Sequence, residues 1–147
     1  MIIRYQTASD AYTTYRLHEP DGEPRCTELC TLADGYTYVA VPEGVTLPTD
    51  QPAEIADSIE TVTLTAELRA QIKAVSPHAQ LIAQRVIDRI RERYSVDDEL
   101  FFARIMIGSQ AGLYTLEPGE MAEVEAFKTW VEAAREWGRN ERAALGL

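Results

Sequence analysis

The residues best suited to chemistry in this sequence lie in VSPHAQ, residues 75–80. This stretch brings Ser76 and His78 close together, and Gln84 follows soon after. A serine near a histidine suggests nucleophilic catalysis, but a triad also needs a carboxylate to orient the histidine, and no local motif supplies one. The same residues are typical of a helix start, because Ser76 can cap a helix and Pro77 suits its first position. We favour this second interpretation and predict no catalytic residue here.

A metal site has few candidate ligands. A zinc site needs about four, and the cysteines and histidines have no standard spacing: Cys26, Cys30, His18 and His78. If the two cysteines share a strand, they are ~13 Å apart at ~3.3 Å per residue. A disulfide requires Cα atoms within ~7 Å. We therefore predict two free thiols, with no metal and no cofactor.

Three consecutive acids, Asp97, Asp98 and Glu99, follow Ser95. They resemble a metal cluster, but a helix start explains them without a metal, because acids in the first turn interact favourably with the helix dipole. We favour the helix start and leave the metal as the alternative. The sequence also has no Gly-rich phosphate loop, GxSxG, HExxH or CxxC motif. These absences favour a protein that is not an enzyme.

Arg85, Arg89 and Arg93 form a row along one edge of the apolar face expected for the helix that starts at Pro77. The row is a candidate anion site. Alternatively, the arginine stems cover the edge of the core while their heads pair with acids such as Asp88. The second interpretation is favoured, and the sequence does not decide whether the row binds an anion.

The predicted strands and helices, which position the candidate residues above, divide the chain into two regions. Residues 1–62 form a β-rich N-terminal region, in which Asp34-Gly35 lies between two β-rich runs and predicts a two-residue hairpin turn. In that register Cys30 faces Val39. Residues 63–147 form a helical C-terminal region. The predicted fold is α+β, with a small N-terminal antiparallel β region followed by a C-terminal helical region of about four helices.

Helical periodicity and capping residues define the predicted elements of the second region. A connector at 42–55 is expected to be extended, and a last strand is expected within 59–65. The helices are expected at 65–75, from Pro77 to about Tyr94, from Val96 to near Gly108, and from near Pro118 to about Leu145. The charged end of the last helix, REWGRNERAALGL, is expected to be exposed.

The last of these helices is a candidate association surface. Its apolar face is wide and contains two tryptophans, a residue type that is enriched in interface cores. Part of this face also follows a heptad pattern. An amphipathic helix of a chain this size can equally pack on its own domain. The candidate protein-interaction residues are Val124, Phe127, Trp130, Val131, Ala134 and Trp137.

The charge and hydropathy of the chain disfavour two classes of function, nucleic acid binding and membrane insertion. The 147 residues have a net charge of −10. Residues 1–63 contain eleven acids and three bases, whereas residues 64–147 contain thirteen acids and eleven bases. This balance disfavours nucleic acid binding, because phosphate backbones attract positive surfaces. No apolar run approaches the ~18 residues of a membrane span, and the first residues lack the apolar segment of a signal peptide. We therefore expect a cytoplasmic protein with no membrane partner.

Three segments resemble small proteins that tailed bacteriophages and prophages encode near their tail-fibre genes. The segments are YVAVPEGVTLPTDQPAEI, TLTAELRAQIKAVSPHAQLIAQRVIDRIRERYSVDDEL and VEAAREWGRNERAALGL. The likeness covers residues 36–147, although GSQAGLYTLEPGEM belongs to only some of these sequences. It includes no catalytic motif, and it does not cover the first 24 residues.

The resemblance implies a tail-associated or tail-fibre-assembly-type protein that acts by binding other phage tail or fibre proteins. Such a protein would be located in the host cytoplasm or in the virion. A homo-oligomer formed through the last helix is also expected. The alternative is a small enzyme or ligand-binding module whose site is assembled from residues scattered along the sequence.

Overall fold

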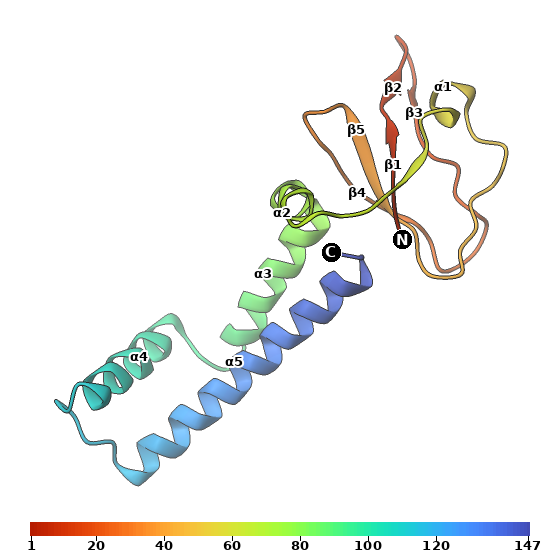
Figure 1. Cartoon of the computed structure of the whole chain (residues 1–147). Coiled ribbons are helices and arrows are strands. Elements are labelled where there is room, and N and C mark those ends of the chain that lie inside the picture. Colours follow the sequence, from red (N-terminus) through yellow and green to blue (C-terminus); the bar gives the residue numbers. More distant parts are fainter. The chain divides into compact units, whose positions relative to one another are not determined.

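The computed structural model describes all residues, 1–147, and they form two units. One unit comprises residues 1–81 together with 141–147, and the other comprises residues 82–140. The boundaries between the units fall within helices α3 (Pro77–Arg91) and α5 (Pro118–Ala144). As predicted, the chain is α+β, with an N-terminal antiparallel sheet followed by helices (Figure 1).

A four-stranded antiparallel sheet of order β4-β5-β1-β6 forms the centre of the first unit. Its strands are β1 (Ile2–Gln6), β4 (Thr27–Thr31), β5 (Tyr36–Ala40) and β6 (Glu60–Val62). Strand β1 is paired on both sides, since Ile3 lies opposite Val39 of β5 and Thr61 of β6. Two short strands, β2 (Ala8–Ser9) and β3 (Thr14–Tyr15), pair separately.

The hairpin between β4 and β5 is present, but the predicted register is wrong. Cys30 pairs with Tyr38 instead of Val39, and the ladder is irregular between Glu28 and Cys30. A two-residue type I′ turn needs positive φ at both central residues, and here only Gly35 has it, at 81°. The N–H of Gly35 instead donates to the carbonyl of Leu32 (3.0 Å), which closes a longer turn and shifts the pairing.

Both faces of the sheet are covered. One face packs against α2 (Ala66–Val75) and the start of α3, in a core that contains Leu29, Tyr38 and Ile72. The other face packs against the short helix α1 (Ala53–Ala56) through Ile55, which is fully buried. The connector at 42–55 is therefore not extended throughout, because burying Ile55 against the sheet favours a helical turn.

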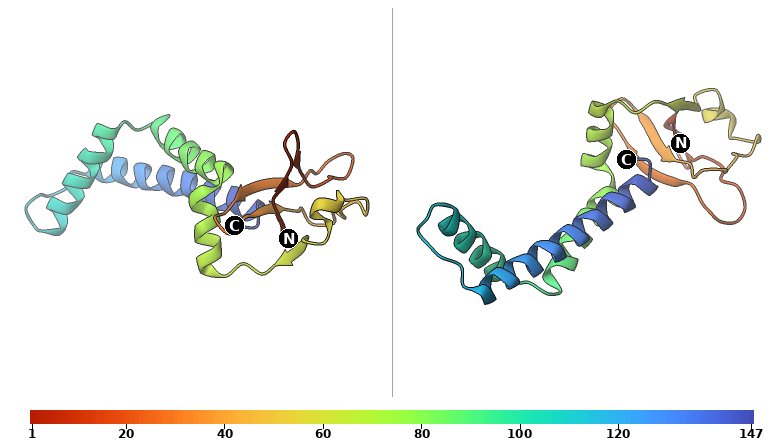
Figure 2. Two further views of the ribbon diagram at one scale, coloured as in Figure 1. Left: turned by 90° about the horizontal axis from the view of Figure 1, so that it is seen from above. Right: turned by 60° about the horizontal axis from the view of Figure 1, so that its bottom comes forward.

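The end of the chain contributes to the first core. Leu147 is buried in the cluster around Ile2 and Ile72, so the prediction of an exposed tail is wrong at this position. Both views of Figure 2 show this end of the chain beside α2 and the sheet. After α5 the chain turns sharply at Gly146, and the N–H groups of Gly146 and Leu147 donate to Ala143 and Arg142. This Schellman arrangement directs Leu147 into the core.

The second unit contains most of α3, α4 (Val96–Gln110) and most of α5. Its core consists of Phe102, Ile105 and Val124, with Tyr94 and Phe127 packed against them. Phe102 stacks on Phe127 with ring centroids 4.9 Å apart. Helix α3 ends three residues before the predicted end, and α4 runs to Gln110, past Gly108.

The predicted start of α4 is confirmed. The hydroxyl of Ser95 accepts from the N–H of Asp98 (3.2 Å), and the carboxylate of Asp98 accepts from the N–H of Ser95 (2.8 Å). These two bonds form a capping box. The hydroxyl of Ser95 also donates to the carboxylate of Asp98 (2.7 Å), and this bond, together with the one from the N–H of Ser95, lowers the pKa of Asp98 from its usual value. Asp98 therefore has a structural role at the start of α4.

Candidate functional site

The stretch around Ser76 is a joint between two helices, as predicted. Ser76 is fully buried, ends α2, and accepts from the N–H of Ala79 (3.4 Å). His78 lies exposed in the first turn of α3, and its side chain makes no hydrogen bond or ion pair. The amide of Gln84 donates to Asp88 (2.8 Å). The structure therefore does not bring a base and an orienting carboxylate together at Ser76.

The two cysteines are free, as predicted, and both are buried. Cys26 belongs to the core on one face of the sheet and Cys30 to the core on the other. Burial raises the pKa of both thiols above its ordinary value, and Glu19 and Asp34 respectively add to the effect. Since the thiolate is the reactive form, neither cysteine has the environment of an activated nucleophile.

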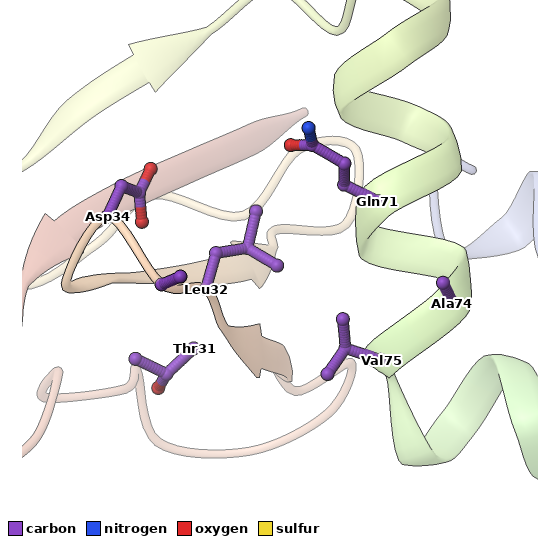
Figure 3. A pocket seen from close by; sticks show the side chains of 7 residues that line it. Thr31, Leu32, Asp34, Gln71, Ala74 and Val75 are labelled. Atoms are coloured by element: carbon purple, nitrogen blue, oxygen red, sulfur yellow. The ribbon is translucent and has the colours of Figure 1, made fainter.

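A groove of about 590 Å³ lies between the β4–β5 hairpin and α2. Figure 3 shows Leu32 reaching from the hairpin toward α2, with Gln71 and Val75 on the helix side. The one carboxylate in the groove, Asp34, accepts from the hydroxyl of Tyr38 (2.9 Å) and the N–H of Tyr36 (3.0 Å). The groove can therefore hold an apolar group beside one amide, but it contains no nucleophile and base within reach of each other.

The arginine row on α3 does not form the ion pairs that we expected. None of the three arginines makes a salt bridge. The guanidinium of Arg89 lies 3.9 Å from the ring centre of Trp137, and that of Arg93 lies 5.6 Å from the ring centre of Trp130. A cation over an aromatic ring is a favourable arrangement. The head of Arg89 therefore interacts with a ring of α5 instead of with Asp88, and that of Arg93 interacts with Trp130 and with Tyr94, whose ring centre is 5.3 Å away.

The six candidate interaction residues of α5 all contribute to this same side of the helix within the second unit. Val124 and Ala134 are buried, and the remaining four are half-buried, namely Phe127, Trp130, Val131 and Trp137. The indole N–H of Trp130 donates to the carbonyl of Arg89 (2.8 Å). Their role in binding another protein stays a prediction.

Most of the exposed large apolar side chains lie in another stretch of the sequence, between residues 96 and 121. They are Val96, Leu100, Phe101, Ile107, Leu113, Tyr114 and Met121. Four residues of α4 form a continuous exposed row on the side opposite Phe102 and Ile105, which we call the outer row of α4. The row contains Val96, Leu100, Ala103 and Ile107.

The outer row was not predicted above, although its apolar spacing is present in the sequence. Successive members are four, three and four residues apart, which places them within an arc of about 60° at ~100° per residue. The buried residues of α4 occupy the opposite arc. Helix α4 therefore has an exposed apolar face as well as a buried one. A surface helix of a monomer ordinarily has polar residues opposite its buried face.

Metal-binding clusters and membrane-spanning helices are both absent from the chain. Nowhere do three or more His, Cys, Asp or Glu side chains converge as metal ligands would. No helix combines the length and the apolar content that crossing a membrane requires. Comparisons with protein-family models, with curated proteins and with solved structures find no match.

Proposed function

We propose that this chain is a non-enzymatic, tail-associated protein of a tailed bacteriophage or prophage. It acts through contacts with other tail or fibre proteins, as a structural component or as a tail-fibre assembly chaperone. Its place is the host cytoplasm or the virion. The proposal does not involve a cofactor, a nucleic acid or a membrane.

The observation that carries the protein-binding part of the proposal is the concentration of exposed large apolar side chains in the stretch from Val96 to Met121. Soluble monomers rarely leave several large apolar side chains exposed on one helix, as α4 does with Leu100, Phe101 and Ile107, and such clusters are typical of interaction sites. The likeness of residues 36–147 to small phage proteins supports the choice of partner. The side chains that suggest chemistry, Ser76 as a nucleophile and Asp98 as a metal ligand, instead take part in capping helices.

A deletion of the gene in the phage or prophage that encodes it tests the proposal. We expect particles that lack tail fibres or adsorb poorly, with recovery when the intact gene is supplied from a plasmid. Mass spectrometry of purified wild-type particles then separates the two roles, because a structural component stays in the particle and a chaperone does not. Unchanged fibres and unchanged adsorption after the deletion would contradict the proposal.

The alternative is a ligand-binding module or small enzyme that uses the groove between the hairpin and α2. The volume of about 590 Å³ supports this alternative, since it is within the range of small-molecule pockets. A thermal-shift screen against small metabolites tests it. A ligand whose stabilising effect is lost in Val75→Asp, but not in Leu113→Asp, would favour the alternative.

A further inference from the structure

We infer that the outer row of α4 pairs with the outer row of a second copy of this chain, with the two helices antiparallel. Val96, Leu100 and Ile107 are each about half exposed or more, at 47%, 50% and 66%. Their spacing is that of the a and d positions of a heptad, the pattern by which helices interlock. The row therefore has the form of one half of a helix pair.

The spacing of the row favours a second copy as the occupant. Intervals of four, three and four residues are the same in both directions along the helix. A two-fold axis through the middle of the row therefore brings Val96 against Ile107 of the other copy. It also brings Leu100 against Ala103 of the other copy, so that a large side chain meets a small one at each central layer. A parallel pair would instead place Ala103 against Ala103 and leave a gap there.

The charges beside the row fit the same arrangement. Asp97 and Arg104 border the outer row on one side, two helical turns apart, and both are exposed. Neither makes an ion pair within its own chain. In the antiparallel pair, Asp97 of each copy approaches Arg104 of the other, which gives two equivalent contacts between opposite charges. Such flanking pairs set the orientation of paired helices.

The pairing is expected to be weak and reversible. The row extends from Val96 to Ile107, or ~16 Å at ~1.5 Å per residue. An interface of this length covers less than the ~800 Å² per partner of a standard protein–protein interface. The dimer therefore forms at high protein concentration.

Sedimentation equilibrium of the intact protein tests the inference, over a range from about 10 μM to about 1 mM. We expect the average mass to rise toward twice that of one chain. Leu100→Glu should weaken the pairing by ~10-fold or more, and Ile107→Glu should act alike. Leu113→Glu is the matched control, because Leu113 is exposed but lies outside the row, and it should leave the pairing unchanged. A single-chain mass at every concentration would overturn the inference.

A charge exchange tests the orientation. Arg104→Asp should weaken the pairing, and the double variant Asp97→Arg/Arg104→Asp should restore it, because the opposite charges again meet. In a parallel pair, the double variant would not restore the pairing, because the carboxylate introduced by Arg104→Asp would face Glu99 of the other copy. If the double variant pairs as weakly as Arg104→Asp alone, the antiparallel arrangement is overturned. Circular dichroism confirms that each variant keeps its helices. Both tests use the purified protein alone, so they are independent of the proposed role in the phage.

Discussion

Ile2 and Gly146 are in direct contact, although they lie near opposite ends of the sequence. The Cδ1 atom of Ile2 is 3.1 Å from the position that a Cβ atom on Gly146 would occupy. Gly146 also has a φ of 74°, in the left-handed region. This contact brings the turn after α5 onto the first strand of the sheet, and it lets Leu147 enter the core.

Gly146→Ala is expected to destabilise the protein, because it adds both backbone strain and a close contact with Ile2. The strain alone costs about 1–3 kcal/mol. Gly44→Ala is the matched control, since Gly44 has a similar φ of 78° but open space around it. Urea denaturation of both variants measures the difference. Equal losses of stability would show that the contact with Ile2 contributes nothing.

Gly35→Val is expected to lower the free energy of unfolding by more than ~1 kcal/mol, because Gly35 is the residue of the hairpin turn with positive φ. The measurement is the denaturant midpoint. Gly119→Ala serves as the control, since Gly119 lies in the first turn of α5 without positive φ and with free space around it. A midpoint unchanged by Gly35→Val would refute the described turn.

Ser95→Ala is expected to cost ~1 kcal/mol of stability through loss of the cap of α4. The partner carboxylate makes the cap sensitive to pH. Because the pKa of Asp98 is lower in the folded protein than its ordinary value, its contribution is present above pH ~3.9 and is lost as the pH falls through the folded pKa. The urea midpoints of the intact protein and of Asp98→Asn should therefore differ at pH 7 and converge near pH 2. A difference that persists at low pH would contradict this explanation.

Arg89 and Trp137 are expected to be energetically coupled. A double-mutant cycle with Arg89→Met and Trp137→Leu should give a coupling of about 0.5–1 kcal/mol, because the guanidinium lies over the indole ring. The corresponding cycle with Arg85→Met is the control, since Arg85 faces neither an aromatic ring nor an acid. If both cycles give the same value, the cation–π contact is not the source of the coupling.

Cys26 and Cys30 should react slowly with a thiol reagent at pH 7–8 in the folded protein. Burial raises the pKa of both thiols, which lowers the fraction of reactive thiolate, and it also restricts access. Ellman's reagent should detect both thiols promptly only in denaturant. Rapid reaction of either cysteine without denaturant would contradict the buried positions described for them.

The fold class and the joints between helices could be predicted from the sequence. The starts of α3, α4 and α5 were predicted correctly from Ser76-Pro77, Ser95 and Pro118. A capping hydroxyl bonds an N–H only two or three residues away, so the information is local. The free state of the two cysteines likewise followed from their separation along one stretch of chain.

Which surfaces are buried depended on the tertiary structure. The hairpin register depends on the backbone of Asp34 and Gly35 and on the irregular pairing in β4, which the residue types alone leave open. The end of the chain is buried because Leu147 meets Ile2, a residue from the opposite end of the sequence. The outer row of α4 is exposed because the opposite side of α4 packs into the second unit's core. An apolar pattern specifies that a face avoids water, but the partner that covers it depends on contacts between residues far apart in the chain.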